Sequence, residues 1–362
     1  MRIMLKIPFY DSERTYEENY DQGPFGAFGD GKVYEQKGEP KGKFLGHEVY
    51  LPLGIPAGPL LNSKFCKSAF EKGFDVCVYK TVRSASFPCH PFPNVLAIHP
   101  DGDLTLDKLK KPLTADTEYT DPLSITNSFG VPSREPSVWQ EDVKKAIASA
   151  GKGQVLVLSF MGTARPGQTQ QEFIDDYILA GRLAAETGAP VLETNLSCPN
   201  IGNEGLVCYN SDITEKIVKG IRSVIGSTPF ILKVGYYNDD KSLERLAGIA
   251  NEYADSISGI NTLQAEVRDR EGKQALPGSL ARLNSGVCGA GIKWAGLDFV
   301  RRLAGIREKR GFKFSIEGVG GVLTAGDYWA YRDAGADSVM TATGAMWNPL
   351  LAVEIKLETC NF

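Results

Sequence analysis

The sequence predicts an α/β fold of the (β/α)8 barrel type, and three observations lead to this prediction. Short apolar runs alternate with amphipathic stretches along most of the chain. Each run is bounded by Gly, Pro or polar residues, as expected of parallel strands buried on both faces. Eight such pairs follow one another, which is the number that a closed TIM barrel requires.

Each expected strand is followed by a stretch with helical periodicity. Glycines at 73, 151 and 188 mark the ends of three helices, and several helices begin at Ser, Thr or Asp residues that can cap them. One helix begins at a proline. The expected strands are 53–57, 76–81, 155–159, 191–195, 230–234, 257–261, 314–318 and 338–342. The expected helices are 62–72, 137–150, 169–187, 212–225, 241–253, 296–310, 325–334 and 349–358.

A doubly wound sheet is the alternative arrangement of these elements. It is disfavoured because both halves of the chain look alike and no G-x-G-x-x-G sequence follows the first strand. A barrel needs about 250 residues, so a chain of 362 residues has a surplus. We interpret residues 1–50 as an N-terminal extension, with the barrel domain over 51–362. Insertions near 84–136 and 263–295 are expected over the catalytic face, where βα loops gather.

Composition narrows the classes of function. The chain is 42% hydrophobic and 23% charged, which is typical of a globular protein with a large core. A net charge of -4 without a basic stripe disfavours nucleic acid as a partner. No membrane-spanning run and no signal sequence are apparent, so no membrane association is expected. Seven cysteines without a C-x-x-C pair predict free thiols, no metal site and a cytoplasmic location.

The expected strands end in residues that suit an anionic ring. Function in such barrels gathers at the C-terminal ends of the strands. Lys80 and Lys233 end the second and fifth strands, and a lysine beside a redox ring can stabilise its negative charge. Each lysine alone could instead be solvated or ion-paired. Four amides could together bind a ring that bears several amide groups, namely Asn127, Asn195, Asn200 and Asn261.

Glycines after the last two strands predict a phosphate site. Gly320 and Gly321 would let backbone N–H groups approach a ligand, and Thr343 and Gly344 follow the eighth strand. Loops after strands seven and eight commonly bind phosphate in this fold. The alternative is that these glycines only form tight turns. After the first strand, Gly58 would let a flat ring lie against the backbone.

The segment 193–200, Glu-Thr-Asn-Leu-Ser-Cys-Pro-Asn, follows the fourth expected strand. A buried Asn carries donors and acceptors on one group, so it can bind the edge of a polar heterocycle. Cys198 lies among such amides and could transfer a proton if its pKa is tuned. The alternative is a turn in which the Asn residues cap backbone groups and Cys198 fills apolar space.

From about Leu51 to its C-terminus, the chain resembles the dihydroorotate dehydrogenases, especially the soluble class with a Cys base. The most specific similarity is Asn-Leu-Ser-Cys-Pro-Asn at 195–200, which matches the catalytic motif of that class. Asn-Ser-Phe-Gly-Val-Pro at 127–132 is similar to its substrate loop. Ile-Leu-Lys at 231–233, Asn-Thr at 261–262 and Gly-Val-Gly-Gly-Val at 318–322 resemble its flavin-lysine, substrate-pair and phosphate segments.

This resemblance implies FMN-dependent oxidation of dihydroorotate to orotate, a reaction of pyrimidine biosynthesis. Cys198 would remove the C5 proton while a hydride passes from C6 to flavin N5. Lys80 would meet the substrate carboxylate and the flavin, and Lys233 the N1/C2=O edge of the flavin. The implied substrate residues are Lys80, Asn127, Phe129, Gly130, Val131, Asn195, Asn200, Asn261 and Thr262. The implied FMN residues are Ala57, Gly58, Lys80, Thr81, Asn127, Asn195, Lys233, Gly289, Gly320, Gly321, Thr343 and Gly344.

The chain also departs from the pattern of that family. Thr194 stands where Leu is usual, Trp294 replaces a frequent Pro, and Cys288 lies in a run that is usually rich in Gly. Residues 341–344 read Thr-Ala-Thr-Gly instead of the usual Ile-Gly-Thr-Ala, and residues 84–121 match no segment of the family. The resemblance further implies a soluble electron acceptor such as fumarate and a homodimer.

Three other functions remain open at this stage. An FMN enzyme acting on another dihydropyrimidine or related ring is one, because dihydropyrimidine dehydrogenase has a similar Asn-Leu-Ser-Cys-Pro stretch. His typically follows that stretch, so Asn200 favours dihydroorotate. A lyase or isomerase could use Lys233 as a Schiff-base nucleophile with a sugar phosphate at the Gly320 loop. A flavin-binding protein without activity is the third.

Overall fold

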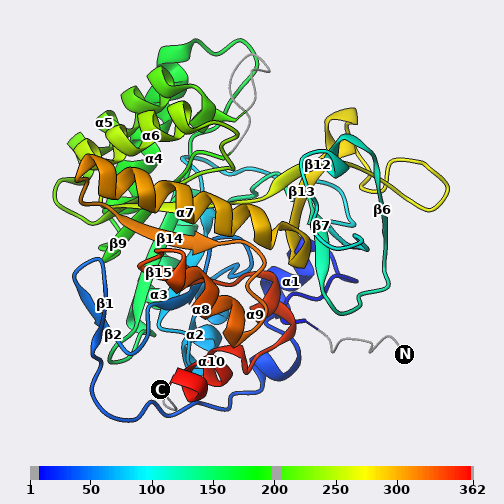
Figure 1. Cartoon of the computed structure of the whole chain (residues 1–362), viewed down its shortest axis with the longest axis horizontal. Helices are drawn as coiled ribbons and strands as arrows, with labels where there is room; N and C mark the ends of the chain where they lie inside the picture. Colours follow the sequence, from blue (N-terminus) through cyan, green and yellow to red (C-terminus); the bar gives the residue numbers. More distant parts are fainter. Residues whose placement is uncertain (1–7, 198–205, 360–362) are drawn as a thin grey trace.

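Eight parallel strands close into a barrel in a computed structural model of the chain, which describes residues 8–197 and 206–359 (Figure 1). The strands follow one another around the barrel in chain order, and the last pairs with the first through Val339 and Leu53. Helices cover the outside of the barrel. The predicted (β/α)8 fold is confirmed.

Each predicted strand and helix is present, with small shifts at its ends. The barrel strands are β3 (Leu53–Ile55), β4 (Val76–Val82), β8 (Val155–Phe160), β9 (Val191–Asn195), β10 (Phe230–Lys233), β11 (Ser256–Gly259), β14 (Ser315–Val319) and β15 (Ser338–Met340). The helices around them are α2 (Ser63–Glu71), α3 (Pro136–Ala148), α4 (Gln170–Ala185), α5 (Ser211–Ile225), α6 (Asp240–Tyr253), α7 (Lys293–Arg310), α8 (Ala325–Asp333), α9 (Thr343–Trp347) and α10 (Leu351–Thr359). None of the helices in the described residues is long and apolar enough to cross a bilayer.

A hairpin that the sequence did not predict closes the N-terminal end of the barrel. Its strands, β1 (Gly42–Phe44) and β2 (His47–Val49), pair antiparallel and lie to the left of the barrel in Figure 1. Phe44 and Val49 are buried in one apolar cluster with Val76, Val155, Val191 and Ile231, whose side chains fill the barrel interior. The bottom of the barrel is therefore a packed apolar core.

The two inserted segments build a single sheet at the opposite end of the barrel (Figure 1). Its strands are β5 (Val95–Ile98), β6 (Leu113–Asp116), β7 (Ser124–Asn127), β12 (Leu263–Arg268) and β13 (Asn284–Gly289). The central pairing joins segments far apart in sequence, because Asn127 of β7 lies opposite Gly286 of β13. The sheet closes on itself through the parallel pair of β12 and β6. The insertions thus form one layer over the barrel mouth.

The N-terminal segment is also packed into the main core. Helix α1 (Tyr16–Gln22) begins with a capping box between Thr15 and Glu18. Phe9, Tyr10, Tyr16 and Phe28 are all buried in the same core cluster as the outer faces of the barrel strands. The Phe9 amide donates to the carbonyl of Met346, which fixes this segment to helix α9. The segment therefore brings aromatic side chains to the barrel mouth.

Candidate active site

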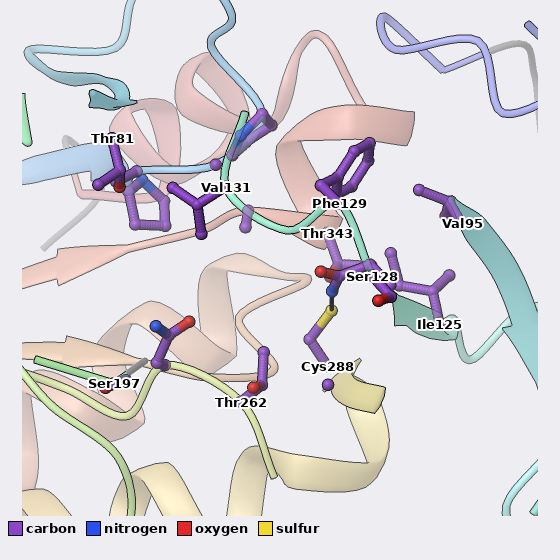
Figure 2. A pocket seen from close by; sticks show the side chains of 18 of the residues that line it. Thr81, Val95, Ile125, Ser128, Phe129, Val131, Ser197, Thr262, Cys288 and Thr343 are labelled. Carbon is purple, nitrogen blue, oxygen red and sulfur yellow. Dashed lines mark hydrogen bonds between the residues drawn. The ribbon is translucent and has the colours of Figure 1, made fainter. Parts of the chain in front are cut away.

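A cavity of about 310 Å³ opens at the C-terminal ends of the barrel strands (Figure 2). Its walls come from the barrel, from the inserted sheet and from the N-terminal segment. In Figure 2, Phe129 and Val131 lie on one side of it, and Ser197, Thr262 and Cys288 lie on the other. The predicted site residues that line it are Ala57, Gly58, Lys80, Thr81, Asn127, Phe129, Gly130, Val131, Asn195, Lys233, Asn261, Thr262 and Thr343.

Four predicted glycines lie beside the cavity but do not contribute to its lining, namely Gly289, Gly320, Gly321 and Gly344. Gly320 and Gly321 follow β14 with φ angles of +126° and +69°. A Cβ on Gly321 would lie 2.8 Å from the carbonyl oxygen of Gly289, so the two loops pack backbone against backbone. This close approach explains the glycines there. Cys198 and Asn200 lie outside the described residues.

Two buried lysines give the cavity its charge. Lys80 at the end of β4 and Lys233 at the end of β10 are 6% and 3% exposed. Lys233 Nζ donates to the Ala57 carbonyl at 3.2 Å, and Lys80 Nζ lies 5.9 Å from the centre of the Tyr16 ring. Neither lysine has a carboxylate within 4.0 Å among the residues that the structure describes. Two buried cations that have no carboxylate in direct contact favour the binding of an anion.

Burial also changes the acidity of Lys80. It lowers the pKa of this ammonium group to about 8, and the charges of Arg83 and Lys233 act in the same direction. A bound anion would stabilise the charged form and raise the pKa again. The charge of Lys80 is therefore coupled to ligand binding.

Amide side chains from three elements face the same space. Asn195 Oδ1, at the end of β9, accepts from the Ser197 amide at 3.0 Å and from Asn261 Nδ2 at 3.4 Å. Asn127 Nδ2, at the end of β7, donates to Cys288 Sγ at 3.5 Å. These contacts orient the amide groups before a ligand arrives. The resulting set of donors and acceptors suits a planar ring that bears several polar groups.

The loop that carries Phe129 is held by two buried arginines. Arg83 donates to the carbonyls of Gly130 at 3.1 Å and of Val131 at 2.9 Å. Arg282, from the second insertion, donates to the carbonyl of Ser128 at 3.0 Å and to its hydroxyl at 3.2 Å. The same guanidinium group of Arg282 also binds the carbonyls of Pro91 and Pro93 in the first insertion. The arginines therefore fix this loop relative to both insertions.

Sequence reasoning missed several residues of the site. Tyr10 lines the cavity, and its ring meets that of Phe129 edge-on, with 5.4 Å between the ring centres. Trp294, noted as a departure, donates its indole N–H to the Leu104 carbonyl at 2.9 Å and so ties the first insertion to α7. No motif marks these residues or the two arginines. Other lining residues that were not predicted are Pro56, Pro59, Val95, Ile125, Ser128, Ser197, Gln264, Asn284, Ser285, Gly286, Cys288, Val319, Ala342 and Met346.

Comparisons with known proteins agree on one family. The family model described as dihydroorotate dehydrogenase matches residues 110–360. A dihydroorotate dehydrogenase of Dictyostelium discoideum is 37% identical over 98% of this chain and 98% of its own length. The catalytic subunit of a dihydroorotate dehydrogenase B (NAD(+)) from Thermodesulfovibrio yellowstonii is 28% identical over 66% of this chain and 72% of its own. One from Trichlorobacter lovleyi is 31% identical over 52% of this chain and 58% of its own.

We predict that Arg282→Lys destabilises the protein by about 2 to 3 kcal/mol, because an ammonium group cannot replace the forked hydrogen bonds to buried carbonyls. Amide hydrogen exchange should accelerate over residues 127–131. Urea unfolding and exchange mass spectrometry measure the two effects. Arg270→Lys is the control, since the exposed Arg270 side chain forms surface ion pairs with Asp116 and Glu118 and its replacement should leave stability nearly unchanged. Equal behaviour of the two variants would contradict the role of Arg282.

Proposed function

We propose that this chain, a flavin-type oxidoreductase that belongs to the dihydroorotate dehydrogenase family, oxidises dihydroorotate to orotate with FMN as its cofactor. The observation that carries the proposal is the pair of buried lysines, which have no carboxylate within 4.0 Å among the described residues and face several amides at a barrel mouth. Dihydroorotate is a small ring with a carboxylate and several amide groups, so its chemistry complements these side chains. The proposed reaction belongs to pyrimidine biosynthesis.

The residues present fit an FMN group. Gly58 lines the cavity with φ +139°, and a Cβ placed on it would meet no atom within 4 Å. A flat ring can therefore lie against this backbone, with Lys233 as the cation for its N1/C2=O edge. We assign the phosphate to the backbone around Gly320, Gly321, Gly289 and Thr343-Gly344, which surrounds the ends of β14 and β15. When bound, FMN supplies the acceptor for the hydride.

The substrate assignments follow the chemistry of the side chains. Lys80 provides the charge for the carboxylate of dihydroorotate. Asn127, Asn195 and Asn261 bind the polar groups of its ring. Asn200 is assigned the same role because of the sequence motif at 195–200. Phe129, Gly130, Val131 and Thr262 complete the walls around it. Because both insertions hold this loop, the substrate would bind in a geometry that is largely formed beforehand.

We propose Cys198 as the general base on the basis of the motif at 195–200. Its thiolate takes the C5 proton of dihydroorotate, and the C6 hydrogen leaves with two electrons, which forms the C5=C6 double bond of orotate. A free thiol has a pKa of about 8.5, so positive charge near the site would favour the thiolate. Lys80 and Lys233 supply such charge.

The electron acceptor and the assembly belong to the same proposal. We propose that a soluble acceptor, fumarate, reoxidises the flavin, and that the chain acts as a homodimer. A cytoplasmic location is supported by Cys66, Cys77, Cys89 and Cys288, which are all free thiols.

The proposal is tested by adding dihydroorotate to the purified protein under anaerobic conditions. The wild type should show a flavin absorption spectrum that bleaches on mixing. In Cys198→Ala the rate constant for bleaching should fall about 10²- to 10⁴-fold, which is the range for loss of a general base. Stopped-flow absorbance measures both. Cys66→Ala is the control, because this buried thiol lies on α2 outside the cavity lining and should leave the rate unchanged.

Other results of this experiment point elsewhere. A flavin spectrum that does not change with dihydroorotate but bleaches with another dihydropyrimidine would show that the second ring is the substrate. A flavin that none of these rings reduces would favour an inactive flavin-binding protein. A chain that binds no flavin after reconstitution with FMN would contradict the cofactor, and trapping of Lys233 by borohydride and a sugar phosphate would then support the lyase.

We further predict that KM for dihydroorotate rises above about pH 8. Lys80 has a lowered pKa, so it is charged below that pH and loses the charge that binds the carboxylate as the pH increases. Lys80→Gln should raise KM at neutral pH and abolish its further rise above about pH 8, the alkaline limb of the profile. Lys241→Gln, a change on the exposed start of α6, is the control. An alkaline limb that persists in Lys80→Gln would show that another group causes it. Steady-state kinetics across pH measure these effects.

A further inference from the structure

Two glutamates lie inside the barrel, one layer below the cavity. Glu193 is two residues before Asn195 on β9, and Glu317 is two residues before Val319 on β14. Asn195 and Val319 both line the cavity. Since side chains two residues apart on a strand share a face, both carboxyl groups point into the barrel beneath the proposed flavin and substrate.

Both carboxyl groups are buried and have few hydrogen-bond partners. Each residue is 1% exposed. Among the described residues, neither carboxyl oxygen of Glu193 has a hydrogen-bond partner, and Oε2 of Glu317 has none either. Oε1 of Glu317 is 3.5 Å from the hydroxyl of Ser256, which donates to it. An ionised carboxylate in such surroundings is costly, so a proton or a charge must compensate for it.

One cation, Lys233, lines the cavity directly above and interacts electrostatically with both acids. Lys233 on β10 lies opposite Asn195 of β9 and Ser258 of β11. Strand β14, which carries Glu317, pairs with β11 and β15. Strand β11 contributes Ser256 and Ser258, and strand β15 contributes Ser338, none of which is charged. Lys80 on β4 adds positive charge at the cavity above. Below, the barrel is apolar.

We infer that Glu193 and Glu317 form a proton-holding pair, which carries one proton and leaves one carboxylate as the counter-ion of Lys233. With one proton, the group of two acids and one lysine is neutral. Without it, the group carries one net negative charge in a dry interior. The pair is thus a positioning site for the charge of Lys233 and has no contact with the substrate.

The electrostatics of the pair agree with this arrangement. The pKa of Glu317 is raised to about 8, mainly by burial and also by the charge of Glu193, whereas Lys233 acts in the opposite direction. Burial raises the pKa of Glu193 as well. The shared proton is therefore lost only on the alkaline side of neutrality.

The consequence for the flavin rests on the proposed function. Reduction adds negative charge above Lys233, so the pair should hold its proton more strongly in the reduced enzyme than in the oxidised one. At pH values between the pKa of the pair in the oxidised enzyme and its pKa in the reduced enzyme, flavin reduction takes up one additional proton. The midpoint potential should fall more steeply with pH there, by one extra proton for each two electrons.

A redox titration of the holoenzyme across pH tests this consequence. The wild type should show the steeper segment near pH 8, and Glu317→Gln should lack it because its amide does not titrate. Glu193→Gln should also lack it, since the remaining acid has no partner to share a proton with. Glu308→Gln, an exposed carboxylate on α7, should retain the wild-type profile. The same slope in wild type and Glu317→Gln would overturn the inference.

A second measurement needs neither flavin nor substrate. The folded state keeps a proton on Glu317 that the unfolded chain releases near its ordinary pKa of 4.5. The free energy of unfolding of the wild type should therefore decrease as pH rises from about 4.5 to 8. Glu317→Gln should lose this part of the pH dependence, and Glu308→Gln should keep it. Equal pH profiles in urea unfolding would refute the pair, whereas a chain that binds no flavin would contradict only the proposed function.

Discussion

Lys80 and Lys233 impose the constraint on which the site depends, because both ammonium groups are buried without a nearby carboxylate among the described residues. A barrel core can hold such charges only if the ligand, or a charge deeper in the barrel, compensates for them. The amides and the open backbone at Gly58 surround these lysines with polar groups and space. The site is therefore built to be completed by an anionic, planar ligand.

The barrel separates its apolar and polar layers along its axis. At the bottom, Phe44 and Val49 of the hairpin close an interior of aliphatic side chains. Above them lies the layer of Glu193 and Glu317, and above that the cavity, which Lys233 lines. The inserted sheet covers the cavity, and Arg282 ties its parts together through backbone carbonyls. The packed core below and the fixed loop above hold the residues that line the cavity in one geometry.

The sequence predicted the barrel well because its strands are buried on both faces and so appear as continuous apolar runs. It could not predict the inserted sheet, whose strand Leu113–Asp116 mixes apolar and polar residues and whose pairing of β7 with β13 joins segments that are far apart in sequence. Tyr10 and Arg282 reach the site through tertiary packing alone, without any local pattern. By contrast, Asn127, Asn195, Asn261 and both lysines were predictable, since they directly end strands or follow them.

The proposed function requires that one cavity binds the flavin and dihydroorotate between these two lysines. A crystal structure of the protein with FMN and orotate tests it most directly. We expect the orotate carboxylate at Lys80, its ring against Asn127, Asn195 and Asn261, and the flavin ring along Ala57 and Gly58 with one edge at Lys233. Orotate bound away from Lys80, or a flavin that does not reach Lys233, would contradict the account.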